Sequence, residues 1–139
     1  MPQLDYVVLA EYVRQDGGTI HIMGAGIDTL FVPQPPAAVQ VGIASRITFD
    51  STEAAGEQHR LNIVLQGPDG PLMDVSRHFE TPPRPAGVPE HWQTALGLAI
   101  RLPLLLPSYG DYSLELIIDG EPDLARSIDL RAAPPPEPG

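Results

Sequence analysis

The regular alternation of apolar and polar side chains limits the fold of this chain more than any other feature of its sequence. It is clearest over residues 39–49. The apolar members of this segment are Val39, Val41, Ile43, Ile47 and Phe49, and the polar members between them are Gln40, Arg46 and Thr48. Because successive side chains of a β-strand point to opposite faces of a sheet, this pattern predicts a strand with one buried face.

Two further alternating segments flank a turn sequence, Gly67-Pro68-Asp69-Gly70. The apolar sets are Leu61, Ile63 and Leu65 before the turn, and Met73, Val75 and Phe79 after it. Two alternating segments joined by a short glycine-containing turn predict a β-hairpin. Pairing the two apolar faces matches odd positions with odd positions, which puts His59 on the inner face and His78 on the outer face.

Residues 114–118 and 124–130 alternate on either side of the turn at Asp119-Gly120 and are expected to be strands. Residues 4–13 are rich in β-branched and aromatic side chains. This composition favours a strand, and we expect it to pair with residues 19–23 through the turn between them.

Residues 92–102 admit two interpretations. Pro89 and Glu90 would suit the first turn of a helix. The segment also alternates from Trp92 to Leu102, and Gly97 would cost a helix about 1 kcal/mol. We therefore interpret the segment as a strand.

Proline clusters keep these segments short. The chain has 17 prolines, which gather at positions 33–36, 82–85 and 134–136. Because proline lacks a backbone N–H, it belongs in loops, sheet edges and tails. Turn signals about every 8 to 12 residues, without a clear helix, are typical of antiparallel sandwiches and barrels.

These patterns predict an all-β fold. We expect a single antiparallel β-sandwich of about eight strands, with an immunoglobulin-like or jelly-roll Greek-key topology. The sandwich domain should span residues 1–131. Residues 132–139 contain too little apolar surface to pack, so they should form a disordered, proline-rich tail.

The segment Gly24-Ala25-Gly26 follows a strand-like run, as the glycines of a dinucleotide-binding turn do. That turn needs a third glycine and a helix whose first amides face the phosphates. Here the third position is Thr29, and the chain continues as Leu30-Phe31 without a helix. We interpret Gly24 and Gly26 as structural residues of a bulge or sharp bend at a sandwich corner.

The segment Gly110-Asp111-Tyr112-Ser113-Leu114 is similar to the tyrosine corner of immunoglobulin-like sandwiches. In that motif a tyrosine enters a strand after a tight turn, and its hydroxyl bonds to the backbone upstream. Tyr112 is therefore expected to be structural, with Gly110 in the turn before it. The motif predicts a fold and carries no activity.

No set of residues has the spacing of a catalytic or metal site. The serines lie in no nucleophile-elbow motif, cysteine is absent, and the four histidines lack a ligand spacing. A hydrolase that uses His91 with a nearby serine or acid finds no specific support. We expect no enzymatic activity, no cofactor and no metal, although calcium binding by the acidic loop 119–123 stays open.

The charge of the chain disfavours anionic partners. Its formal net charge is −10, and all eight basic residues are arginine. Such a field repels nucleic acids and anionic membrane surfaces, so we expect neither as a partner. The start of the chain lacks the features of a signal peptide, and no apolar run reaches the roughly 20 residues that span a bilayer, so we expect a cytoplasmic protein.

The leading functional hypothesis is a non-enzymatic protein-interaction or structural module. A homodimer formed through edge strands is open, because unpaired strand edges can pair with a second chain. The alternative is a small-molecule or carbohydrate binder. In that case Trp92, Tyr109 and His91, with the loop 80–91, would line a cleft.

Several segments together resemble a known family. They are "LDYVVLAEYVRQDGGTIHIMGAGIDTLFVP", "VGIASRITF", "GPDG" and "PSYGDYSLELIIDG". In this order they are similar to a bacterial domain family of unknown function, made of small β-proteins and best represented in actinobacteria. The similarity runs from about Leu4 to Leu130. It implies a compact β-domain and transfers no catalytic residue; the absence of lysine is consistent with the GC-rich genome of such a source.

Overall fold

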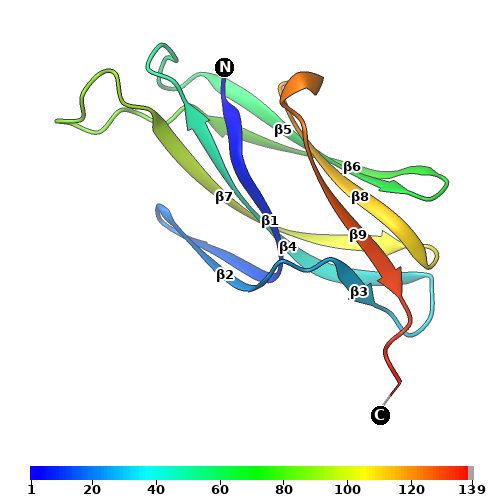
Figure 1. Ribbon diagram of the computed structural model, residues 1–139. Helices are drawn as coiled ribbons and strands as arrows, with labels where there is room; N and C mark the ends of the chain where they lie inside the picture. Colours follow the sequence, from blue (N-terminus) through cyan, green and yellow to red (C-terminus); the bar gives the residue numbers. More distant parts are fainter. Residues whose placement is uncertain (138–139) are drawn as a thin grey trace.

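The computed structural model describes residues 1–137 and arranges them in two stacked β-sheets (Figure 1). The nine strands of this part of the chain are β1 (Gln3–Asp16), β2 (Thr19–Ala25), β3 (Thr29–Phe31), β4 (Ala37–Phe49), β5 (Gln58–Gly67), β6 (Gly70–Glu80), β7 (Thr94–Leu106), β8 (Gly110–Ile118) and β9 (Arg126–Ala133). The one helical element in residues 1–137 is a 3₁₀ turn, η1 (Pro122–Leu124). The predicted all-β class is confirmed. Between residues 1 and 137 there is no helix with the length and apolar character needed to cross a bilayer.

The strand order in one sheet is β2-β1-β4-β7 and in the other β3-β9-β8-β5-β6. All pairings are antiparallel except that of β3 with β9, which is parallel. The expectation of a purely antiparallel arrangement is therefore wrong at β3. The physical reason is that no hairpin joins β3 to β9, so no tight turn imposes opposite directions on them.

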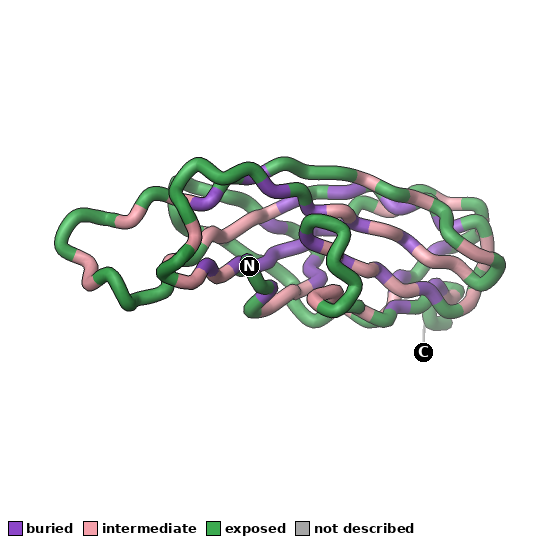
Figure 2. The backbone as a smooth tube through the Cα atoms, turned by 90° about the horizontal axis from the view of Figure 1, so that it is seen from above, coloured by how far each residue is buried: buried purple, intermediate pink, exposed green. Residues whose placement is uncertain are grey.

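One hydrophobic core lies between the sheets (Figure 2). Its largest fully buried side chains are Phe49, Ile43, Ile47, Leu61, Ile63, Leu65, Leu102, Leu104, Leu106, Leu114, Leu116 and Ile118. All of these except Leu104 and Leu106, which follow the segment predicted to end at Leu102, belong to the alternating sets predicted from the sequence. Met73 and Val75 are only half-buried because β6 lies at the edge of its sheet.

The predicted hairpin is confirmed, with Ile63 opposite Val75 and odd positions paired with odd positions. His59 is buried and His78 is exposed, as that parity requires. Strand β7 starts at Thr94, so the prediction that it begins at Trp92 is wrong; Trp92 lies in the turn that precedes it.

The end of the chain differs from the expected boundary at residue 131. Strand β9 continues to Ala133, and the buried Ala132 pairs with both Gly110 and Leu30. Residues 134–137 have no regular secondary structure. The predicted tail also includes residues 138–139, which lie outside the described part of the chain.

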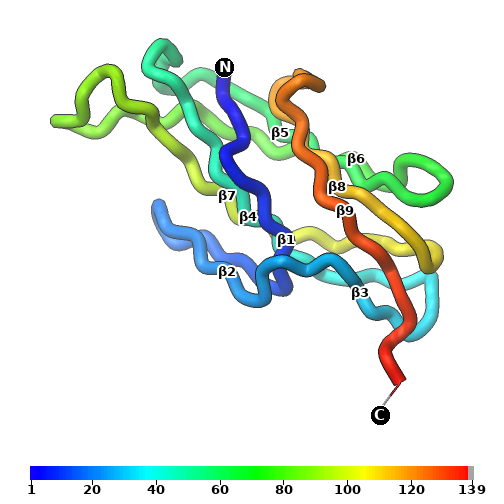
Figure 3. Tube along the Cα trace, in the orientation of Figure 1, coloured from blue at the N-terminus to red at the C-terminus, as the bar shows by residue number. Residues whose placement is uncertain are grey.

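The chain crosses from one sheet to the other between β2 and β3 (Figure 3). The structure places Gly24 and Gly26 at this bend, with φ angles of 68° and 85°. These values lie in the left-handed region, which glycine adopts without steric cost. The Gly26 N–H donates to the Leu9 carbonyl over 2.9 Å, and the Arg131 N–H donates to the Asp28 carbonyl over 2.9 Å, so the crossing is bonded to both sheets.

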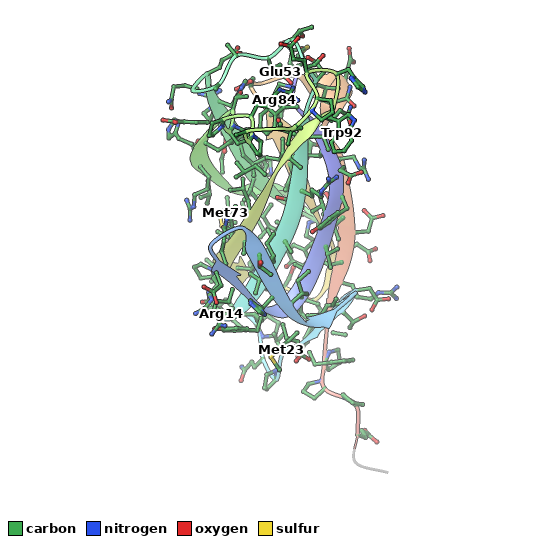
Figure 4. All side chains as sticks on the ribbon, turned by 90° about the vertical axis from the view of Figure 1, so that its left-hand side faces the viewer. Arg14, Met23, Glu53, Met73, Arg84 and Trp92 are labelled. Atoms are coloured by element: carbon green, nitrogen blue, oxygen red, sulfur yellow. The ribbon has the colours of Figure 1, made fainter. Side chains whose placement is uncertain are left out.

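The second half of β1 and the whole of β2 form an arm, residues 11–25, that crosses the outer face of β4 and β7. Pairing of β1 with β4 ends at Ala10 opposite Gly42, although β1 continues to Asp16. The arm packs on that face through a small buried cluster of Ala10, Val13 and Ala44, with Ile20 and Ala99 beside it. Figure 4, which labels Arg14 and Met23 on the arm, shows it in front of the sheet.

Candidate functional site

A groove of about 650 Å³ lies where the crossing segment passes β4. We call it the β3–β4 groove. Its lining residues are Glu11, Gly24, Ala25, Gly26, Ile27, Asp28, Thr29, Leu30, Phe31, Val39, Gln40 and Val41. Two strand edges therefore border it, one from each sheet.

The β4 edge of this groove has unpaired backbone groups. Residues 37–41 pair with β7 on one side, but β1 pairs with β4 only from Gly42 onward. The direction of the free groups follows from β7, where the Ala99 N–H donates to the Gln15 side-chain carbonyl at the outer edge over 3.3 Å. Ala99 is therefore a non-hydrogen-bonded partner of Ala44, and the backbone of even-numbered β4 residues points away from β7.

It follows that Ala38 and Gln40 direct their N–H and C=O groups toward the groove. Within residues 1–137, no hydrogen bond outside the β4–β7 ladder reaches the backbone of residues 37–41. Two donors and two acceptors are thus exposed along this short edge. Unpaired edge groups of this kind are a template for an added strand.

The β3 edge contributes a second set of free groups. The Arg131 N–H donates to the Asp28 carbonyl, and the Val32 N–H donates to the Ala133 carbonyl over 2.9 Å. The backbone of Asp28 and Val32 therefore faces β9. Because backbone direction alternates along a strand, the N–H and C=O groups of Thr29 and Phe31 face away from β9, on the open edge of β3.

The side chains of the groove are mainly apolar, with an acidic margin. Leu30 and Val41 are buried beneath it, whereas Phe31 is 56% exposed. Glu11 and Asp28 are the charged residues of the lining, and no arginine belongs to it. The groove is therefore suited to an apolar segment that carries positive charge.

An adjacent cavity of about 520 Å³ extends the acidic margin. It is lined by Asp28, Asp111, Tyr112, Asp129, Leu130 and Arg131, so Asp28 belongs to both cavities. Three carboxylates and one guanidinium leave it with net negative charge. No ion pair within 4.0 Å joins these groups in residues 1–137.

A buried polar cluster, which the sequence did not reveal, lies at the other end of the core. The His59 Nδ1 is 2.7 Å from the Asp119 carboxylate, and its Nε2 is 2.9 Å from the Thr81 hydroxyl. This order of hydroxyl, imidazole and carboxylate is that of a hydrolase triad. The only available signal was the inward parity of His59.

The position of this cluster is that of a structural contact between three segments of one sheet. His59 is 5% exposed and Thr81 is 3% exposed, so no substrate carbonyl can reach the hydroxyl. The His59 ring stacks on Phe79 with centroids 5.2 Å apart, and Asp119 also accepts the Arg60 N–H over 2.9 Å. The cluster connects the start of β5, the end of β6 and the turn after β8.

The structure separates the binding residues suggested by the sequence. His91 and Trp92 lie before β7 and Tyr109 lies after it, and β7 has 13 residues, which corresponds to about 43 Å. They cannot line one cleft. Figure 4 shows Trp92 and Arg84 at the opposite end of the molecule from Met23.

Each of these residues has a local environment of its own. The Tyr109 hydroxyl donates to the carbonyls of Val32 and Pro33, both over 3.0 Å, and so connects the β7–β8 turn to the segment after β3. The Arg84 guanidinium donates to the carbonyl of Trp92 over 2.8 Å. Both His91 and the Trp92 side chain are exposed in that loop.

Tyr112 makes the contacts of a tyrosine corner. Its hydroxyl donates to the Ser108 carbonyl over 2.6 Å and accepts the Ser108 N–H over 3.2 Å. Its side chain is buried, and Gly110, the first residue of β8, has a φ of 133°. These bonds close the turn between β7 and β8.

The acidic loop 119–123 does not form a cation site within the described residues. Asp119 directs its carboxylate to His59 and Arg60, and Asp123 is in the η1 turn. Among residues 1–137, no three histidine, aspartate or glutamate side chains are grouped as metal ligands.

Two comparisons with known proteins bear on the chain. A family model, described as a family of unknown function (DUF6941), matches residues 5–131. A search of the curated proteins gives no match. The resemblance to an uncharacterised domain family is therefore confirmed, and no activity comes with it.

Proposed function

Since the chain belongs to DUF6941, a family of unknown function, we propose from its own surfaces that it is a non-enzymatic protein-interaction module. It binds an extended segment of another protein in the β3–β4 groove. The segment adds as a strand to the free edge of β4.

The observation that carries this proposal is the free backbone of Ala38 and Gln40 beside an apolar floor. An added strand takes its affinity from main-chain hydrogen bonds to such an edge, and pockets for alternate side chains give specificity. The free groups of Thr29 and Phe31 border the same groove. The occupant is therefore held by main-chain bonds and by burial of apolar side chains against Phe31, Ile27 and Val39.

Charge defines the partner further. The lining carries Glu11 and Asp28 without an arginine, and the whole chain has a formal net charge of −10. A segment that alternates apolar residues with lysine or arginine is complementary to this field. An acidic segment is repelled by it.

The strand order supports an immunoglobulin-like topology for the module. The order β1-β4-β7 corresponds to strands A, B and E of that fold, and β9-β8-β5-β6 corresponds to G, F, C and C′. Tyr112 at the start of β8 occupies the position of the tyrosine corner on strand F. The all-arginine basic set supports an actinobacterial source, and we propose the cytoplasm as the place of action.

Titration of isotope-labelled protein followed by NMR tests the proposal. The probe is a blocked eight-residue peptide that alternates valine with arginine, and its matched control alternates valine with glutamate. We expect the arginine peptide to shift the amide resonances of Ala38, Gln40 and Phe31, and the glutamate peptide to leave them unchanged. Unshifted amides with both peptides would overturn the proposal.

A pair of proline variants tests the main-chain contacts. Gln40→Pro removes an N–H that faces the groove and leaves the β4–β7 ladder intact. It should therefore lower the affinity for the arginine peptide about tenfold. Leu105→Pro removes an N–H from the outer edge of β7 and should leave the affinity unchanged. Equal affinities for both variants would show that the peptide does not bind as an added strand.

A small apolar ligand is the second candidate for the same groove. Its volume of about 650 Å³ lies in the range of about 300–1,000 Å³ for small-molecule sites. A thermal-shift screen against metabolites and sugars distinguishes it, because a ligand selective for the folded state raises the melting temperature. A hit whose affinity is unchanged by Gln40→Pro would favour this alternative.

A further inference from the structure

We infer that the arm, residues 11–25, controls access to the β3–β4 groove, an inference that rests on the function proposed for it. The arm has two mutually exclusive positions. Docked on the outer face of the sheet, it leaves the β4 edge free, and aligned with the rest of β1 it occupies that edge.

The register of β1 defines the second position. Leu9 lies opposite Ile43 and Ala10 opposite Gly42, and the pairing then stops. In the same register, Tyr12 would lie opposite Gln40 and Arg14 opposite Ala38. The arm would thus use the backbone groups that a partner strand needs.

The docked position depends on residues without bulky side chains on the outer face. A Cβ atom on Gly42 would lie 2.8 Å from a Val13 methyl group and 2.9 Å from the Val13 backbone nitrogen. A Cβ atom on Gly97 would lie 2.7 Å from Ile20 Cδ1. Ala44 and Ala99 complete the flat surface on which the arm lies.

Polar contacts of two residues, Gln15 and Arg101, hold the docked arm, and one of them is a hydrogen bond from Arg101 to the Tyr12 hydroxyl. The Gln15 side-chain amide donates to the Gly97 carbonyl over 2.7 Å and accepts the Ala99 N–H. Arg101 donates from Nε to the Val13 carbonyl over 3.0 Å, and its guanidinium lies 4.2 Å from the centre of the Tyr12 ring. Most of the arm's other side chains are exposed. The docked state is therefore held at a few sites, and a change at one of them shifts the balance between positions.

Displacing the arm with Gly42→Val tests this inference. Gly42 does not line the groove, yet a side chain there collides with the Val13 backbone, which cannot move aside without the arm. We expect slowed hydrogen exchange at the Ala38 and Gln40 amides, because the released arm pairs with β4. The affinity for the valine–arginine peptide should fall about tenfold or more.

Thr48→Val is the matched control for this variant. It places the same valine side chain on the same face of β4, at a position paired with Gln3 rather than covered by the arm. It should leave both measurements unchanged. Slow exchange at Ile63 and Leu116, in the opposite sheet, shows in each variant that the core is folded.

Locking the arm gives the opposite change. The Cβ of residue 97 would lie 3.1 Å from Ile20 Cγ1, which is bonded to the Cβ of Ile20, so Ile20→Cys with Gly97→Cys brings two Cβ atoms within disulfide reach. The chain has no other cysteine. The oxidised variant should keep fast exchange at Ala38 and Gln40 and bind the peptide at least as tightly as the unmodified protein.

The outcomes separate the two proposals. Protected Ala38 and Gln40 amides in Gly42→Val support the arm inference even where no peptide binds, and absent peptide binding then overturns only the proposed function. Fast exchange of both amides in a folded Gly42→Val protein overturns the arm inference. A locked variant with protected Ala38 and Gln40 amides overturns it as well.

Discussion

The outer edge of β7 and the groove edge of β4 belong to the same sheet, but the first is protected against pairing with another strand and the second is not. The β7 edge is 13 residues long and has a single charged side chain, Arg101. Such an edge is a site for unwanted pairing with another chain. Pro103 has no N–H to offer there, and the Gln15 side chain occupies the Gly97 carbonyl and the Ala99 N–H. The long edge is therefore blocked.

The groove edge of β4 has none of these devices. Residues 37–41 contain no charge, and proline occurs only before them, at Pro35 and Pro36. The free groups of Ala38 and Gln40 lie beside apolar side chains. The molecule thus protects the edge that would aggregate and leaves the shorter edge available. A short edge bordered by a groove selects a partner, whereas a long bare edge does not.

The largest effect is expected when the β7 edge is opened. Gln15→Ala combined with Pro103→Val frees two backbone groups and restores a third on an edge whose one charged side chain is Arg101. We expect the double variant to self-associate as its concentration rises, measured by size-exclusion chromatography with light scattering. Each single variant keeps either the Gln15 side chain or Pro103 at the edge, so each should self-associate less than the double variant. A double variant with the elution and mass of the unmodified protein would contradict the account of the β7 edge.

A moderate effect is expected inside β4. Ser45 is on the strand that has the open edge, but its hydroxyl is fully buried and has no hydrogen-bond partner within residues 1–137. Ser45→Ala should raise the free energy of unfolding by about 1 kcal/mol, because it removes an unpaired polar group. Urea denaturation measures this change. The affinity for the valine–arginine peptide should not change, since Ser45 faces the core.

Ser127→Ala is the control for this variant. Ser127 is exposed on β9, and its removal should change the stability by less than about 0.5 kcal/mol. A Ser45→Ala protein that is less stable than the unmodified protein would contradict the assignment of Ser45 as an unpaired buried hydroxyl.

The smallest effect on stability is expected at Asp50, the residue that follows β4. Asp50 accepts hydrogen bonds from the hydroxyl and the N–H of Thr52, and they hold the pKa of its carboxyl below the ordinary value. The pKa of Asp50 is lower in the folded protein than in the unfolded chain. The ionised Asp50 therefore stabilises the fold at pH values above its unfolded pKa, and this stabilisation is lost as the pH falls through its folded pKa. The stability difference between the protein and Asp50→Asn should therefore shrink as the pH falls below 3.8.

Urea denaturation at a series of pH values measures this difference, and Glu90→Gln controls for the change in net charge. Glu90 is exposed and makes no hydrogen bond or ion pair within residues 1–137. A difference for Asp50→Asn that stays constant down to pH 2 would contradict the assignment. The peptide affinity should be unaffected, which separates the two ends of β4.

The candidate site was only partly predictable from the sequence. Gly24 and Gly26 were expected at a corner, and the structure has a corner there. Trp92 and Tyr109 were suggested as partners in a cleft, yet β7 separates them by its whole length. Aromatic type marks a candidate binding residue. The alternation of residues 92–102 predicted a strand between the two, but not that this strand continues to Leu106 and places Tyr109 at its far end.

The strands and the face on which each of their side chains lies followed from local alternation. Alternation is a property of neighbouring residues, so it assigned Ile43, Ile63 and Leu116 to the core and His59 to the inner face without any knowledge of the partner strands. The tertiary structure alone decided which strands are neighbours: that β3 runs parallel to β9, that β1 leaves β4 at Gly42, and that a groove opens where it leaves. These features depend on contacts between residues far apart in the chain, and the period of two is the same whichever strand lies alongside.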